Sequence, residues 1–136
     1  MDFVLDASFT LHWCFEDEAT DASDALLTRL QNQNDTAWVP AIWPPELLNG
    51  LDKGITRGRI ERQRALLLWQ ETCALPIRII DVPINETLLE LALQHNLAVY
   101  DASYLSLAVM RSLPIATGDG KLQTAARNAG LGIIQP

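Results

Sequence analysis

Short apolar runs alternate with longer amphipathic stretches along the whole chain. The apolar runs predict strands over residues 2–6, 37–40, 76–81, 113–117 and 131–134. Between them, apolar side chains recur at helical spacing and predict helices over residues 16–31, 44–55, 60–73, 84–95, 101–111 and 122–128. Strands that alternate with helices are typical of an α/β fold, in which helices cover both faces of a mostly parallel sheet.

The length and the apolar content are those of one globular unit. The chain has 136 residues, of which 49% are hydrophobic, so we expect a single domain over residues 1–136 and exclude a disordered chain. The apolar runs are too short to span a bilayer, so no membrane association is expected. No basic segment of a secretory signal precedes the first strand, and we expect a cytoplasmic protein. Cys14 and Cys73 belong to no metal-binding or redox motif and are expected to be free, buried thiols.

The charge of the chain bears on a nucleic-acid partner. A net charge of −7 argues against one, because the phosphate backbone is itself negative. However, five of the 10 basic residues lie between residues 53 and 64, in either a solvated turn or a patch that contacts phosphates. Four of the 17 acids are assigned to a metal site below, which leaves 13 acidic against 10 basic residues, or −3. Charge alone therefore neither supports nor excludes RNA as a substrate.

Two carboxylates directly follow predicted strands. Asp6 follows the first strand, and Asp119 follows the strand over residues 113–117. In an open α/β sheet, ligands bind outside the carboxyl ends of the strands, at the point where the winding reverses. If these two strands are neighbours, both acids project into one cleft. Each acid also has a simpler interpretation, Asp6 as a helix or turn cap and Asp119 as part of an Asp-Gly turn.

Two further acids lie at predicted helix starts. Asp101 is placed as an N-cap, and Glu46 falls in the first turn of a helix that begins near Pro44 or Pro45. Capping and the helix dipole alone favour acids at such positions. Asn49, one turn after Glu46, is placed to orient that carboxylate by hydrogen bonding. His12 is interpreted as a core or edge residue rather than a ligand.

Four carboxylates at one edge of a sheet repel one another unless a cation compensates them. Oxygen ligands without His or Cys favour a hard cation, Mg²⁺ or Mn²⁺. The natural chemistry of such an ion is phosphodiester hydrolysis, because the ion activates a water and stabilises the departing oxygen. The chain contains no P-loop, no nucleophile elbow and no Cys–His pairing at a suggestive spacing that would indicate another mechanism.

Four segments of the chain resemble the PIN domain, and within that family the VapC-type ribonuclease toxins of bacterial toxin–antitoxin pairs. The segments are V-L-D-A-S at residues 4–8, P-P-E-L-L-N-G-L at 44–51, Y-D-A-S-Y-L-S-L-A at 100–108 and L-P-I-A-T-G-D-G-K-L at 113–122. They occur in the order and with the spacing of the family, and the resemblance covers nearly the whole chain.

The resemblance implies a three-layer α/β/α sandwich with strand order 3-2-1-4-5, in which the first and fourth strands are neighbours. It implies an acidic, metal-binding catalytic site made of Asp6, Glu46, Asp101 and Asp119. Asp6, Asp101 and Asp119 resemble the main metal ligands of the family. Glu46 resembles a further ligand or a water-orienting residue. Polar positions that support such a site are matched by Ser8, Asn49 and Thr117.

The resemblance also implies an activity and partners. The implied activity is Mg²⁺- or Mn²⁺-dependent endonucleolytic cleavage of RNA by a toxin. Members of the family commonly form homodimers and are held inactive by a cognate antitoxin whose tail enters the acidic cleft. This chain departs from related sequences at Gly118 and Gly120, which flank Asp119 where larger residues are frequent, and at Pro44-Pro45 before Glu46. Neither departure removes a carboxylate.

Two other functions remain open. The fold could serve as a non-catalytic module that binds RNA or protein, although the presence of all four acids weighs against this. A haloacid-type phosphatase would need an acid two residues after its first aspartate, and this chain has Ser8 there.

Overall fold

The computed structural model describes residues 1–136 and contains one five-stranded sheet. The strands are β1 (Phe3–Leu5), β2 (Ala37–Pro40), β3 (Ile77–Ile80), β4 (Ile115–Ala116) and β5 (Ile133–Ile134). All neighbouring pairs are parallel, and the order is β3-β2-β1-β4-β5. The expected strand order is therefore confirmed, and β1 lies beside β4.

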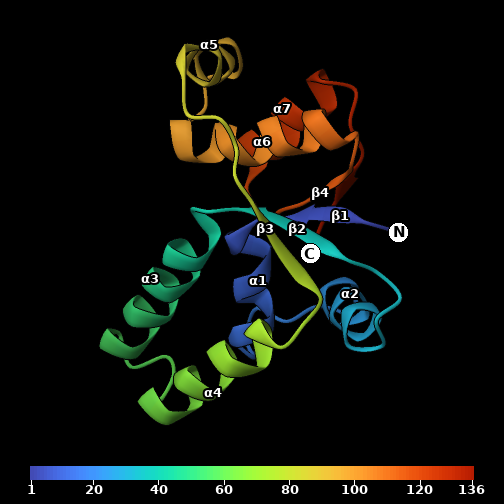
Figure 1. Ribbon diagram of the computed structural model, residues 1–136. Helices are drawn as coiled ribbons and strands as arrows, with labels where there is room; N and C mark the ends of the chain where they lie inside the picture. Colours follow the sequence, from blue (N-terminus) through green and yellow to red (C-terminus); the bar gives the residue numbers. More distant parts are fainter.

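Helices cover both faces of the sheet and complete a three-layer sandwich (Figure 1). One face carries α1 (Ala7–Cys14), α2 (Asp21–Gln31), α3 (Trp43–Thr56) and α4 (Arg62–Cys73). The other face carries α5 (Glu86–His95), α6 (Val99–Arg111) and α7 (Gly120–Asn128). The winding therefore reverses between the neighbouring strands β1 and β4, which is where ligands of open α/β sheets bind. No helix is long and apolar enough to cross a membrane.

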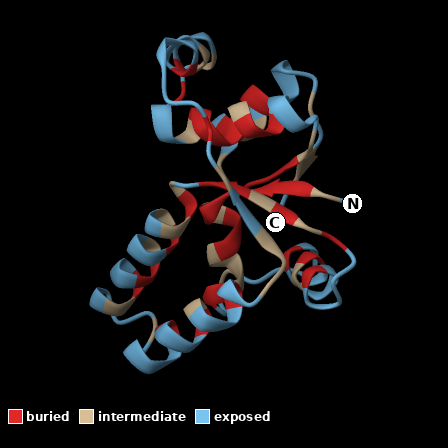
Figure 2. Ribbon diagram, viewed as in Figure 1, coloured by how far each residue is buried: buried red, intermediate tan, exposed pale blue.

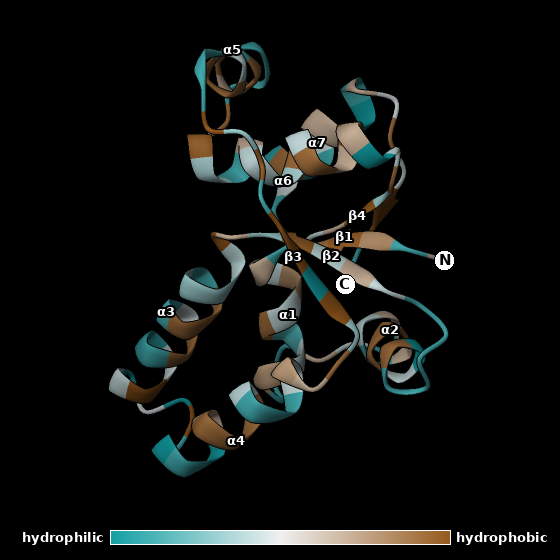
Figure 3. Ribbon diagram, in the orientation of Figure 1, coloured by the Kyte–Doolittle hydropathy of each residue, from teal (hydrophilic) through white to brown (hydrophobic).

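The centre of the core is β1 with the inner face of α6 (Figure 2). Each residue of β1 is completely buried, as expected for a parallel strand covered on both faces. Most buried positions coincide with hydrophobic stretches of the ribbon, although α4, α5 and α6 also expose apolar side chains (Figure 3). A rigid centre of this kind fixes the positions of the residues that directly follow β1 and β4.

The sequence pattern missed α1 and extended α2 too far toward the N-terminus. The segment after β1 is a helix, in which Phe9 and Thr10 are buried. Its uniformly uncharged sequence gave no amphipathic signal. The acidic residues 16–18 precede α2, which begins at Asp21 because Thr20 forms a capping box with Ser23.

Two local expectations were wrong. Asp101 is the third residue of α6 rather than its cap, since Ala98 occupies the N-cap position and the helix begins at Val99. Cys73 is exposed, whereas Cys14 is buried, although both are free as expected. The other boundaries differ from the expected ones by only a few residues.

Close packing of α1 against α3 links the acidic helix start of α3 to the end of β1. The indole Nε1 of Trp43 donates to Thr10 Oγ1 at 3.1 Å, and the Thr10 hydroxyl donates to the carbonyl oxygen of Asp6 at 3.2 Å. Further along, a Cβ added at Gly54 would lie 2.7 Å from the Phe15 ring, and one at Gly50 would lie 2.7 Å from Leu11. The two glycines thus allow the helices to approach this closely.

We expect Gly54→Ala to lower the free energy of unfolding by about 1–2 kcal/mol, because the clash with Phe15 outweighs the gain in helix propensity. Urea unfolding monitored by circular dichroism measures this difference. Gly120→Ala is the control, since its new methyl group would meet no atom within 4 Å. Equal stabilities of the two variants would contradict the packing argument.

Candidate acidic site

Asp6 lies directly after β1, and its carboxylate is almost completely buried, with 4% of the residue exposed. It occupies the N-cap position of α1, but its side chain makes no capping hydrogen bond. Instead, the hydroxyls of Ser8 and Thr117 each donate to its Oδ2 at 2.6 Å. The capping interpretation therefore does not account for the Asp6 side chain.

Backbone amides also bind these two hydroxyls. The amide N–H of Gly118 donates to Ser8 Oγ at 3.1 Å, and that of Asp119 donates to Thr117 Oγ1 at 3.0 Å. Because an ionised carboxylate can only accept, both hydroxyls donate to Asp6 while they accept from these amides, and the two hydroxyl oxygens lie 3.3 Å apart. Oδ2 of Asp6 thus acts purely as an acceptor, and the loop after β4 is tied to the end of β1.

Asp119 belongs to that loop and caps α7. Its Oδ1 accepts a hydrogen bond from the backbone N–H of Lys121 at 3.0 Å. Asp119 is therefore the N-cap of α7, a local role close to the Asp-Gly turn of the simpler interpretation, and it uses its Oδ1 for this role. Its negative charge nevertheless acts on the site, because it raises the pKa of both Asp6 and Asp101.

Glu46 reaches the site from the first turn of α3. Its Oε1 accepts a hydrogen bond at 2.8 Å from the hydroxyl of Tyr104, a completely buried residue of α6. Burial raises the pKa of the Glu46 carboxyl, the hydrogen bond from Tyr104 lowers it, and the charges of Asp6 and Asp101 raise it further. Glu46 is thus held between two helices on opposite faces of the sheet.

Asp101 lies in the first turn of α6 and makes no capping hydrogen bond. Burial raises its pKa, and so do the charges of Asp6 and Asp119, while Lys121 acts in the opposite direction. The four acids therefore share one electrostatic environment. Burial likewise raises the pKa of the Asp6 carboxyl, despite the two hydroxyl donors.

The negative charge of this site is not compensated by ion pairs. The four salt bridges of the chain involve Met1, Arg29 and Arg59 with Asp17, Glu18 and Asp35, and none includes a carboxylate of the site. Like charges that approach one another without a counter-charge are held together only by the packing of their elements. A site of this kind attracts a cation.

The donor chemistry of the site fits a hard divalent cation, because all the donors are oxygens and their charge is uncompensated. In the arrangement described here, however, no three His, Cys, Asp or Glu side chains form a group that could hold a metal ion. Two of the carboxylates are engaged elsewhere, Glu46 with Tyr104 and Asp119 with the start of α7. The four acids are coupled electrostatically without forming a closed coordination shell.

Sequence reasoning missed Tyr104 and overestimated Asn49. Asn49 is exposed and makes no side-chain hydrogen bond, so the expected bond to Glu46 is absent. Tyr104 resembled an ordinary core residue, three positions after Asp101 on the apolar face of α6. The available signal was its hydroxyl, because a buried tyrosine oxygen needs a polar partner.

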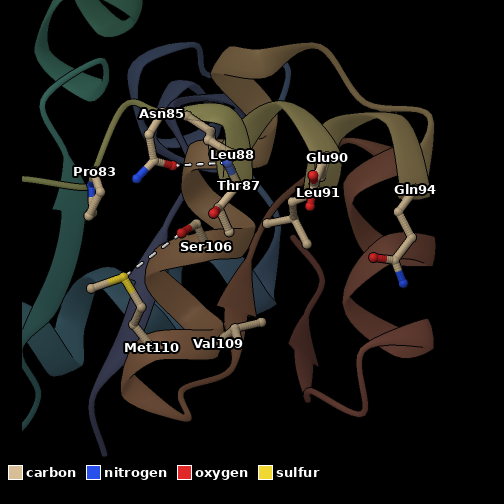
Figure 4. A pocket seen from close by; sticks show the side chains of 10 residues that line it. All are labelled: Pro83, Asn85, Thr87, Leu88, Glu90, Leu91, Gln94, Ser106, Val109 and Met110. Atoms are coloured by element: carbon tan, nitrogen blue, oxygen red, sulfur yellow. Dashed lines mark hydrogen bonds between the residues drawn. The ribbon is translucent and has the colours of Figure 1, made fainter.

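A different hollow, of about 400 Å³, lies between α5 and α6 (Figure 4). Leu88, Leu91, Val109 and Met110 line it together with the single carboxylate of Glu90. One carboxylate among apolar side chains does not make a metal site. The acidic residues at the ends of β1 and β4 therefore remain the candidate site.

Comparison with known proteins identifies the family of this fold. The model of the PIN domain matches residues 3–128. The chain belongs to the PIN domain family. Curated protein sequences give no significant match to it.

Two solved structures share the fold of this PIN domain. The crystal structure of PAE2754 from Pyrobaculum aerophilum has a TM-score of 0.76 and 19% identity, covering 98% of this chain and 84% of that chain. VapBC2 from Rickettsia felis, bound to a DNA fragment from their promoter, has a TM-score of 0.64 and 16% identity, covering 99% of this chain and 98% of that chain.

We expect Tyr104→Phe to raise the pKa of Glu46, because the carboxylate loses the donor that favours its charged form. The loss of this hydrogen bond costs about 1 kcal/mol of stability. NMR titration of the side-chain carboxyl carbon of Glu46 measures the shift. Tyr100→Phe is the matched control on the same helix, since Tyr100 is 64% exposed. An unchanged pKa in Tyr104→Phe would contradict the role given to this hydroxyl.

We expect Asp101→Asn to stabilise the metal-free PIN domain at pH 7, because it removes one of the mutually repelling charges. The pKa of Asp101 is raised in the folded state, so its contribution is favourable below the ordinary value of 3.8 and is lost as the pH rises above it. The gain should therefore vanish below about pH 4. Thermal unfolding in EDTA from pH 3 to 7 tests this, with exposed Asp52→Asn on α3 as the control. A less stable Asp101→Asn at pH 7 would contradict the repulsion.

Proposed function

We propose that this PIN domain is a metal-dependent ribonuclease of the VapC type, which hydrolyses phosphodiester bonds within RNA chains. The observation that supports the proposal most is the set of four coupled, unpaired carboxylates outside β1 and β4. Such a site repels an anionic substrate unless a cation is bound between them. Its oxygen donors are of the hard type that Mg²⁺ or Mn²⁺ prefers. Nuclease activity is also the general property of the family.

The residues of the chain have distinct roles in this proposal. Asp6, Asp101 and Asp119 hold the ion, which when bound supplies an activated water and stabilises charge on the phosphate. Ser8 and Thr117 keep Asp6 ionised and oriented through its Oδ2. Glu46 is a further ligand or orients the attacking water, and Tyr104 positions its carboxylate.

We also propose protein partners for the chain. The neighbour from Rickettsia felis is a VapBC assembly bound to promoter DNA, which supports a cognate antitoxin here. A homodimer is supported by the apolar side chains that α5 and α6 expose, including Leu93 at 72% and Met110 at 56%. Met110 also lines the hollow of Figure 4. The cytoplasm is the compartment in which such a toxin would meet its RNA.

One observation favours a second candidate, a PIN fold that binds RNA or protein without turnover. The four acids do not form a metal-holding group in the present arrangement, and Glu46 and Asp119 are engaged in other hydrogen bonds. A non-catalytic module would bind no ion at this site. Metal titration by calorimetry separates the two candidates, since only the nuclease should show saturable binding that Asp101→Asn removes.

We expect the purified chain to cleave RNA in Mg²⁺ or Mn²⁺ and to lose this activity in EDTA. Asp101→Asn should lower the cleavage rate by about 100-fold or more, because it removes a ligand whose loss weakens both the ion and its water. Gel analysis of a mixture of structured and single-stranded RNAs measures the rates.

Asp52→Asn is the matched control, because it removes one exposed carboxylate of α3 and should leave cleavage unchanged. Cleavage by Asp101→Asn at the rate of the unaltered chain, or undiminished cleavage in EDTA, would refute the proposed mechanism.

A further inference from the structure

A groove of about 320 Å³ leads away from the acidic site between α1 and α3, which lie side by side in Figure 1. At one end it is lined by Ser8, Gly118 and Asp119, which belong to the site. At the other end it is lined by basic residues at the C-terminus of α3 and in the following turn. The groove therefore runs from Asp119, at the edge of the acidic site, to Lys53, Arg57 and Arg59, and Glu18 also lines it.

Glycines keep this groove open. Gly50 and Gly54 line it where α3 touches Leu11 and Phe15, and a side chain at either position would clash with them. At the acidic end, a Cβ at Gly118 would lie 3.1 Å from Nε2 of His12. The departure of Gly118 from related sequences thus has a spatial consequence, since a larger residue would narrow the groove beside the site.

The basic residues of the groove differ in how they are paired. Arg59 forms salt bridges with Asp17 and Glu18, both at 3.1 Å, and lies over the Phe15 ring at 4.3 Å. Lys53 and Arg57 are exposed and take part in none of the salt bridges of the chain. Arg59 therefore serves the fold, whereas the other two charges remain available for a ligand.

Helix geometry places these two charges in line with the site. Lys53 and Arg57 follow Glu46 by seven and eleven residues, which puts all three on one face of α3 and its end. At a rise of about 1.5 Å per residue, the two cations lie about 10 and 16 Å from Glu46 along the helix axis. A phosphate backbone that starts at the carboxylates would pass both of them.

We propose that this groove holds the RNA strand on one side of the bond to be cleaved, and that Lys53 and Arg57 bind its phosphates. The inference rests on the proposed ribonuclease function and adds the path of the substrate. The acidic end accommodates a phosphate only together with a cation, and the basic end attracts further phosphates of the same strand. For Lys53 and Arg57, this proposal favours the phosphate-contacting patch over the solvated turn that the sequence also allowed.

The test measures binding of a labelled single-stranded RNA of about 20 nucleotides, longer than a typical single-strand site. Fluorescence anisotropy is measured at several salt concentrations in the Asp101→Asn background, where the RNA stays intact. We expect Lys53→Gln with Arg57→Gln to weaken binding about tenfold or more at low salt. The slope of log affinity against log salt should fall by about 1.4, or about 0.7 for each phosphate that the groove no longer binds.

Arg62→Gln with Arg127→Gln is the matched control, because both residues are exposed, take part in no salt bridge and lie outside the groove. This pair changes the net charge equally and should alter the slope by much less. Lys53→Arg with Arg57→Lys keeps the charges and should bind RNA like the unaltered groove.

Equal losses in the Gln pair and the control pair would overturn the path, because net charge alone would then explain both. Unchanged RNA binding in the Gln pair would also overturn it, because Lys53 and Arg57 would then bind no phosphates of the strand. Cleavage by the chain with Asp101 intact is measured separately. A chain that binds RNA through Lys53 and Arg57 but cleaves none would refute the proposed function and leave the groove standing.

Discussion

The contact between Asp6 and Thr117 is the interaction on which the candidate site depends. It joins the ends of β1 and β4, which are 111 residues apart in sequence and adjacent in the sheet. Two backbone amides of the loop after β4 hold the hydroxyls of Ser8 and Thr117, and these hydroxyls hold Asp6. The loop that carries Asp119 is therefore positioned by the most buried carboxylate of the site, so a change at Thr117 would disturb two acids at once.

The burial and mutual repulsion of the site carboxylates lower the stability of the folded protein. The pKa values of the Asp6, Glu46 and Asp101 carboxyls are raised, first by burial and then by neighbouring carboxylates, among them Asp119. Hydrogen bonds from Ser8, Thr117 and Tyr104 favour the charged forms, but they do not remove the repulsion. Local structure alone does not require such an arrangement, since the side chains of Asp6 and Asp101 cap nothing. The cation of the proposed mechanism would account for why these acids lie together.

The sequence was sufficient for the architecture, but not for the hydrogen bonds that the predicted site acids make with their neighbours. The alternation of apolar runs and helices along the chain predicted the sheet, and the resemblance to the PIN domain predicted its strand order. The helix α1 has no charged face and gave no such signal. The Tyr104–Glu46 hydrogen bond joins α6 to α3. The two residues are 58 positions apart, so no local sequence pattern predicts that they pair. Asp101 was misplaced as a cap because capping depends on backbone angles at Ala98.

The proposed path along the α1–α3 groove would allow an acidic protein to bind a polyanion. A net charge of −7 repels RNA at long range, but screening at physiological salt limits that repulsion to about 8 Å. Within the groove, the local charges decide. Arg59 forms salt bridges with Asp17 and Glu18 that hold the turn after α3 in place. Lys53 and Arg57, at the end of α3, form no salt bridge and can contact a ligand in the groove. A strand that enters there would meet cations before it meets the carboxylates, which gives the substrate a direction of approach that net charge does not reveal.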